Sequence, residues 1–195
     1  MNILIDELPE AVEVDGVEYP LNTDFRTGIQ CILDFEDQDI TDDEKAVLLL
    51  SRLYKDDMPK DVNQAVRLAV KFLDGGKEDD AENPFGERHR LYSFEKDASL
   101  IYAAFQQTHG IDLQSAELHW WQFLALFMDL GADTAFNSIV NLRRRVKNGD
   151  ATKEEREQAL KMGVVFDLPE YHEYMNFEEN ENAELFALLS EGGQQ

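Results

Sequence analysis

The sequence LHWWQFLALFMDLGADTAFNSIVNLRRRV, residues 118 to 146, places two adjacent tryptophans in an apolar block and follows them with a cluster of arginines. In the first part, WWQFLALFMDL, apolar side chains cover nearly the whole circumference of a helix, so this helix belongs inside a domain or inside an interface. Both readings stay open, because Trp and Met are also favoured where partners dock. We expect the core of the C-terminal half to include Trp120, Phe123, Leu124 and Phe127.

The arginines beside this block, together with Lys147, form the only dense basic patch of the sequence. Nucleic-acid binding is disfavoured, since the net charge opposes it and no stacking aromatics are interleaved with the patch. Pairing with acidic segments of the same chain, within one molecule or between subunits, or with carboxylates of a client, is favoured instead. The candidate partner-binding residues are Trp120, Trp121, Phe123, Phe127, Arg143, Arg144 and Arg145.

An excess of acidic residues dominates the composition. The 195 residues include 41 Asp plus Glu against 18 Lys plus Arg, which gives a formal net charge of -23 and a sequence pI near 4.3. Such a surface is repelled by phosphate backbones and by anionic lipid, so we expect neither nucleic acid nor membrane as a partner. The charge favours solubility, and a basic partner stays open. Hydrophobic residues make up 43% of the chain, enough for most of it to fold.

Cysteine content and hydropathy bear on the compartment. The single cysteine, Cys31, excludes an intramolecular disulfide and fits a reducing environment. It lies in an apolar pattern, which indicates buried packing rather than a nucleophile. The N-terminus resembles no signal peptide, and no segment reaches the ~18 uninterrupted apolar residues of a membrane span. We therefore expect a cytoplasmic protein.

Residues 12 to 19, VEVDGVEY, predict a short β-hairpin. Apolar and acidic side chains alternate on both sides of Asp15-Gly16, a pair that tolerates the positive φ angles of a type I′ turn. The candidate inner residues are Val12, Val14, Val17 and Tyr19.

Helical periodicity and capping residues predict the rest of the fold. The first predicted helix begins after Asn22 or Thr23, and its apolar face consists of Phe25, Ile29, Ile32 and Leu33. The second begins with a capping box of Thr41 and Glu44. The third runs from Pro59 to Gly75-Gly76. The fourth predicted helix begins at Ser93 and ends at Gly110, and the fifth begins at Asp112 or Ser115 and ends at Gly131. A sixth helix follows Asp133. The last helix begins with a capping box of Thr152 and Glu155 and ends at about Met162.

The predicted fold class is therefore mainly α, an assembly of about six to seven helices with a small N-terminal β-hairpin. The predicted parts are the hairpin and helices of residues 1–76, an acidic linker at 77–90, a helical C-terminal part with the Trp-Trp block at 91–168, and an acidic mobile tail at 169–195.

The sequence singles out no catalytic residue, metal site or cofactor site. The acidic run 34 to 44 spaces Asp37 and Asp39 as in a calcium-binding loop, but Asp42 stands where the sharp turn requires glycine and Thr41 occupies a ligand position. The four histidines are far apart, and no zinc, phosphate-loop, dinucleotide or serine-hydrolase motif occurs. Pairs of carboxylates do not indicate a glycosidase site here, because a chain with 41 acidic residues contains pairs at any sequence spacing.

The stretch from Leu118 to Arg145 resembles the signature of the bacteriophage gene-product-fifteen family. Members carry a His-Trp-Trp-x-Phe-x-Ala-Leu-Phe block, then a short turn, an Ile-containing helix and an arginine. Here these are His119, Trp120, Trp121, Phe123, Ala125, Leu126 and Phe127, then Ile139 and Arg143. The similarity extends more loosely over the chain and ends before the acidic tail.

The resemblance implies a phage tail assembly chaperone, mainly helical with a small N-terminal β element, and no catalysis or cofactor. Members are encoded near the tape-measure gene of long-tailed phages, so the implied partners are the tape-measure protein, the tail-tube protein as a second candidate, and further copies of the chain, in the cytoplasm of the bacterial host. An acidic carrier could shield apolar stripes of such a client. The alternatives are a structural virion protein of the tail or head-tail junction, and an acidic DNA mimic that acts as an inhibitor.

Overall fold

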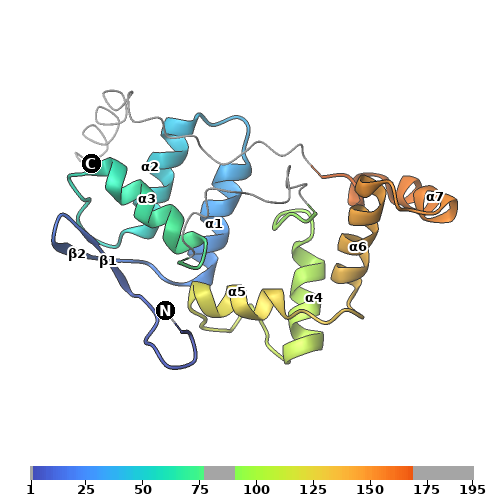
Figure 1. Ribbon diagram of the computed structural model, residues 1–195, viewed down its shortest axis with the longest axis horizontal. Helices are drawn as coiled ribbons and strands as arrows, with labels where there is room; N and C mark the ends of the chain where they lie inside the picture. Colours follow the sequence, from blue (N-terminus) through green and yellow to red (C-terminus); the bar gives the residue numbers. More distant parts are fainter. Residues whose placement is uncertain (1, 77–90, 169–195) are drawn as a thin grey trace. The chain divides into compact units, whose positions relative to one another are not determined.

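A computed structural model of the chain describes residues 2–76 and 91–168 (Figure 1). In chain order the elements are β1 (Ala11–Val14), β2 (Val17–Pro20), α1 (Phe25–Glu36), α2 (Asp42–Leu53), α3 (Val62–Leu73), α4 (Ala98–His109), α5 (Trp120–Met128), α6 (Ala135–Asn148), α7 (Lys153–Met162) and the short 3-10 helix η1 (Gly163–Val165). The predicted mainly α fold with an N-terminal hairpin is confirmed: the described residues form seven α-helices and one two-stranded antiparallel sheet.

The chain divides into two compact units. Of the described residues, 2–76 and 118–123 belong to the first unit, and 91–117 and 124–168 to the second. The division falls inside α5, so the first four residues of this helix, Trp120 to Phe123, belong with β1, β2 and α1 to α3. The linker and tail predicted at 77–90 and 169–195 lie outside the described residues.

The hairpin has the predicted register and turn. Val12 pairs with Tyr19 and Val14 with Val17, while Asp15 and Gly16 adopt φ angles of 50° and 76°. Helix α3 packs against β1, and Val14 is buried. Val17, expected on the inner side, is 52% exposed beside the turn on β2.

The helix boundaries agree with the sequence where the capping partner is local. Both predicted capping boxes, Thr41 with Glu44 and Thr152 with Glu155, are present. Helix α1, however, is capped by Asp24, whose carboxylate accepts the N–H of Arg26. Similarly, α3 begins after Asp61 rather than at Pro59.

Two helix starts in the second unit lie further along the chain than predicted. The hydroxyl of Ser93 accepts N–H groups of a turn, and α4 begins only after Asp97. Asp112 accepts hydrogen bonds from the N–H of Gln114 and the hydroxyl of Tyr102, so it closes a turn and α5 begins eight residues later. These hydrogen bonds favour the ionised form and hold the pKa of the Asp112 carboxyl below its usual range.

The core of the first unit is aliphatic where α1, α2 and α3 pack together. Leu21, Leu49, Leu50 and Leu53 are fully buried, and so is Cys31, in agreement with its apolar spacing. Burial raises the pKa of the Cys31 thiol to about 12, which keeps it protonated and unreactive at neutral pH. None of the helices in the described parts of the chain has the length and apolar character that crossing a membrane would require.

Candidate functional site

The tryptophan block begins where two helices of the first unit exchange backbone hydrogen bonds. The first N–H groups of a helix have no partner within it. Here the N–H of Trp120, the first residue of α5, donates to the carbonyl of Thr23 at 2.7 Å, and the N–H of Phe25, the first residue of α1, donates to the carbonyl of Leu118 at 3.1 Å. Each helix therefore satisfies the start of the other.

His119 caps α5 and holds the N-terminal segment. Its ring Nδ1 accepts the N–H of Trp121 at 3.0 Å, and its own N–H donates to Oε1 of Gln122 at 3.0 Å, an arrangement equivalent to a capping box. The ring Nε2 lies 3.0 Å from the carbonyl oxygen of Pro9. Because that carbonyl can only accept, Nε2 is the donor of the ring and Nδ1 its acceptor.

Trp120 fills the space between α1 and α3. Its side chain is 1% exposed, and its indole N–H donates to the carbonyl of Leu73 at 2.8 Å. The ring stacks on Phe123 with centroids 5.6 Å apart, and Phe123 stacks on Phe25 at 5.0 Å. A Cβ at Gly28, in α1, would lie 2.3 Å from the indole. The close approach of α1 therefore depends on glycine at this position.

Trp121 also contacts the C-terminal end of α3. Its indole N–H donates to the carbonyl of Phe72 at 2.7 Å, one residue before the acceptor used by Trp120. A Cβ at Gly76 would lie 2.5 Å from the ring of Trp121. Two adjacent indoles thus cap carbonyls in the last turn of α3, where a helix lacks internal donors. We refer to His119, Trp120 and Trp121 as the tryptophan anchor.

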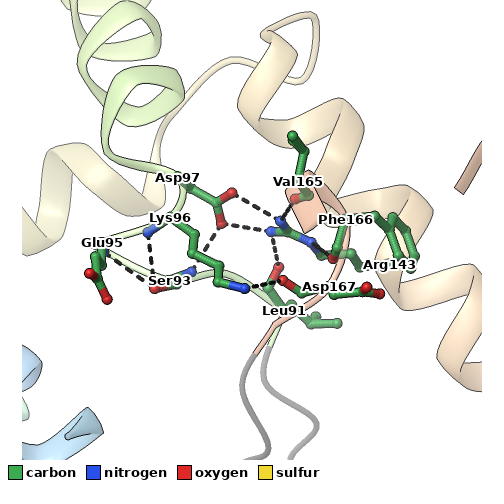
Figure 2. Close-up of polar contacts among 9 residues, drawn as sticks. All are labelled: Leu91, Ser93, Glu95, Lys96, Asp97, Arg143, Val165, Phe166 and Asp167. Atoms are coloured by element: carbon green, nitrogen blue, oxygen red, sulfur yellow. Dashed lines mark hydrogen bonds and ion pairs between the residues drawn. The ribbon is translucent and has the colours of Figure 1, made fainter. Parts of the chain in front are cut away.

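In the second unit, a buried guanidinium uses all five of its N–H groups (Figure 2). Arg143 is 1% exposed and forms a two-pronged ion pair with Asp97, at 2.6 Å from Nη1 and 3.0 Å from Nη2. Its remaining N–H groups donate to backbone carbonyls of Leu91, Val165 and Phe166 at 2.7 to 3.1 Å. Because an arginine has five such donors, none is left unsatisfied in the interior.

The same arginine brings together three segments that are distant in sequence. Asp97 precedes α4, Arg143 lies in α6, and the accepting carbonyls of Val165 and Phe166 follow α7 (Figure 2). The Oδ2 atom of Asp97, which accepts from Nη1 of Arg143, also accepts the N–H of Ser93 at 3.0 Å. The ammonium of Lys96 donates to the carbonyl of Asp167 at 3.0 Å. We refer to the pair of Asp97 and Arg143 as the arginine clasp.

Phe127 lies in an aromatic cluster of the second unit. Its ring centroid is 5.1 Å from that of Tyr92, 5.4 Å from that of Phe94 and 5.5 Å from that of Phe136. Such spacing is typical of favourable aromatic contacts. Phe127 thus belongs to the C-terminal core, as expected from the sequence.

The candidate partner-binding residues belong to different units: Trp120, Trp121 and Phe123 to the first, and Phe127, Arg143, Arg144 and Arg145 to the second. Trp120 and Phe123 are buried with the N-terminal elements, which differs from the expected C-terminal core, and Leu124 is partly exposed. Trp121 is half-buried in the first unit. The reason for the difference is that α5 begins against α1 and α3, whose backbone groups it satisfies.

The three arginines have different environments. Arg143 is used inside its own unit, so in this structure its guanidinium is not available to a partner. Arg144 is exposed and donates to Oδ1 of Asn141, and Arg145 is 47% exposed in an ion pair with Glu155. The spacing of Arg143 from the buried residues Phe136, Ile139 and Val140 places it on the apolar face of α6, a signal that indicates burial.

Three further residues of these sites were not singled out as site residues from the sequence. Gly28 interrupts a helix interior, which is a weak signal of close packing. Asp97 is one of 41 acids, and His119 stands at a helix start where histidine is an uncommon cap. No group of three or more His, Cys, Asp or Glu side chains converges on a metal-sized position within residues 2–76 and 91–168.

A family model described as Bacteriophage Gp15 protein matches residues 4–168. The matched range covers most of the chain, includes the tryptophan anchor and the arginine clasp, and ends before residues 169–195. No curated protein and no solved structure matches the chain.

Gly28→Ala distinguishes helix propensity from packing against the indole. Propensity alone predicts a gain of about 1 kcal/mol in the free energy of unfolding, since alanine replaces glycine inside a helix. We expect instead a loss of about 1–3 kcal/mol, because the new methyl group overlaps the ring of Trp120. Urea denaturation of the variant, of Trp120→Phe and of the double variant measures the coupling. Stabilisation by Gly28→Ala alone would contradict the packing.

His119→Asn and His119→Gln separate the two ring contacts. Asparagine places an oxygen near Nδ1 and can still accept the N–H of Trp121, whereas glutamine places an amide near Nε2 and can still donate to Pro9. Each variant should lose about 1 kcal/mol, and His119→Ala should lose more than either. Hydrogen exchange at the Trp121 amide should stay slow in the asparagine variant and accelerate in the glutamine variant. Equal exchange in both would show that His119 does not cap α5.

Arg143→Met should lower the free energy of unfolding by about 3–5 kcal/mol, because it leaves the buried carboxylate of Asp97 unpaired. Arg144→Met is the matched control on the same helix, and it should change stability by less than about 0.5 kcal/mol because its side chain is exposed. The double variant Arg143→Met/Asp97→Leu should recover part of the loss. Urea denaturation measures all four proteins, and equal effects of the two single arginine substitutions would rule out the clasp.

Proposed function

We propose that this chain, a member of the bacteriophage Gp15 protein family, is a phage tail assembly chaperone that binds the tape-measure protein and keeps it soluble during tail morphogenesis. Family membership carries the proposal. The proposed activity is binding without catalysis or a cofactor, in the cytoplasm of the bacterial host. The tail-tube protein is a second proposed partner, and the chain is proposed to act as a homo-oligomer.

The acidic surface supports a carrier function. A long helical client with apolar stripes aggregates unless the stripes are covered. A carrier with a net charge of -23 adds strong electrostatic repulsion between complexes, which opposes their aggregation. The charge thus supplies solubility for the complex as a whole, and client contacts need to occupy only part of the surface.

Exposed apolar side chains on both units also support the proposal. Leu4 in the first unit and Met128 and Leu160 in the second are each more than four-fifths exposed. Separate small apolar contacts are weak individually, but they add up along a client that repeats its apolar stripe. Weak repeated contacts also permit release when tail-tube subunits enclose the client.

The charge distribution weakens the DNA-mimic alternative. Residues 135–167 contain seven basic and five acidic residues, a formal charge of +2, while the other 162 residues contain 11 basic and 36 acidic residues, a charge of -25. A mimic of a phosphate backbone requires regularly spaced negative charge along its surface. Helices α6 and α7 would interrupt such an array.

Coexpression with the tape-measure protein of the same phage tests the proposal. We expect the client to move from the insoluble to the soluble fraction and to copurify with this chain. The control is an unrelated acidic protein of similar net charge, which should leave the client insoluble. A client that stays insoluble with both proteins would overturn the chaperone proposal.

The composition of purified phage particles separates the chaperone from the structural virion protein. Mass spectrometry should find this chain absent, or far below one copy per structural position. Stoichiometric amounts in washed particles would overturn the chaperone proposal in favour of a virion component.

A further inference from the structure

The N-terminal segment forms a closed turn with three aliphatic side chains on its surface. The carbonyl of Asn2 accepts the N–H groups of Ile5 at 3.1 Å and Asp6 at 2.9 Å, and the side chain of Asn2 accepts the N–H of Leu4 at 3.0 Å. The carboxylate of Asp6 in turn accepts the N–H of Asn2 at 2.6 Å. The backbone groups are therefore satisfied locally and the turn has a defined shape. We refer to Ile3, Leu4 and Ile5 as the apolar turn.

The exposure of the apolar turn is unusual in this chain. Ile3, Leu4 and Ile5 are 46%, 86% and 80% exposed. Single exposed aliphatic residues are normal on protein surfaces, but a contiguous group marks a binding site more often. Among the described residues, every other large exposed apolar side chain stands alone in the sequence.

The turn is tied to the folded part of the first unit. The carbonyl of Pro9 contacts Nε2 of His119, and the carbonyl of Glu10 accepts the N–H of Leu21 at 2.8 Å. The tryptophan anchor thus fixes the point at which the N-terminal segment leaves the fold. A partner bound at the apolar turn would be held by the first unit.

The stretch of sequence that contains the apolar turn carries charge of one sign. Residues 1–25 contain seven Asp or Glu residues and no Lys or Arg. A second copy of this segment would bring like charges together, and an anionic lipid surface would be repelled for the same reason. A partner with lysine or arginine beside an apolar stripe meets both the apolar and the acidic groups.

We propose that the apolar turn is a docking surface for an amphipathic helix whose aliphatic stripe is bordered by lysine or arginine. The stripe covers Ile3, Leu4 and Ile5, and the basic borders lie against acidic side chains such as Glu7 and Glu10. A helix suits this role because side chains three and four residues apart form one stripe. The identification of the natural partner as a basic amphipathic segment of the tape-measure protein rests on the proposed function.

A synthetic peptide tests the surface without the client. The probe is a fluorescent helical peptide of about 18 residues, about five turns, with a leucine stripe and lysine borders. Its comparison peptide has the same stripe with glutamate borders. Fluorescence anisotropy with the full-length protein should show binding of the lysine peptide that is at least about tenfold tighter, about 1.4 kcal/mol.

Variants assign the binding to the turn. Leu4→Gln/Ile5→Thr removes apolar surface without a change of charge and should weaken binding of the lysine peptide by at least about tenfold. Val17→Thr, the control at a valine that is 52% exposed on β2, also removes apolar surface without a change of charge and should bind like the parent. Glu7→Gln/Glu10→Gln should bind more weakly at low salt and show a smaller loss on addition of salt. Circular dichroism checks that each variant is folded.

The outcomes separate this surface from the proposed function. No binding of the lysine peptide, equal binding of both peptides, or equal binding by the parent and Leu4→Gln/Ile5→Thr would overturn the docking surface. If the parent solubilises the tape-measure protein and Leu4→Gln/Ile5→Thr does so equally well, the chaperone function stands without this surface. If the peptide results are as expected but the parent does not solubilise the client, the surface stands and the chaperone function falls.

Discussion

A helix end that cannot satisfy its own backbone groups must find partners elsewhere, and the first unit is organised around this requirement. The last turn of α3 exposes carbonyls, and the starts of α1 and α5 expose N–H groups. The indoles of Trp120 and Trp121 and the backbone exchange between α1 and α5 satisfy these groups together. Buried groups of this kind cost about 1–3 kcal/mol each when left without a partner. The position of α5 in the first unit follows from that cost, and the close approach at Gly28 follows from the position of Trp120.

The second unit meets a comparable requirement with charge. Taking a guanidinium and a carboxylate out of water costs several kcal/mol per ion, and their attraction offsets this only when the remaining donors and acceptors are also satisfied. Arg143 and Asp97 meet that condition through backbone carbonyls and the N–H of Ser93. A purely apolar pair could have supplied similar stability. The ionic pair also fixes the geometry of its surroundings, because the five donors of a planar guanidinium are satisfied only when the carbonyls around it lie in matching positions.

The features that could be predicted from the sequence are those whose partners lie within a few residues. The turn at Asp15-Gly16 and the capping box of Thr41 are predictable from the sequence because the interacting groups of each are close in sequence. The acceptor of the Trp120 indole is a backbone carbonyl 47 residues away, and a carbonyl has no residue-specific signature. The burial of Arg143 follows from its place on the apolar face of α6, but its partner was one acid among 41. The residue types indicate that the indole and the guanidinium need hydrogen-bond partners if they are buried. Only the fold shows which groups those partners are.

The order in which the chain is synthesised gives the discontinuous first unit a further significance. Helices α1 to α3 leave the ribosome well before residues 118–123, which belong to the same unit but follow residues 91–117 of the other unit in the sequence. Contacts such as that between His119 and Pro9, 110 residues apart, can form only when the later segment has emerged. Until then the last turn of α3 and the space beside Gly28 remain open to solvent. The nascent chain therefore passes through a period in which it is itself aggregation-prone, and its own acidic charge opposes association during that period.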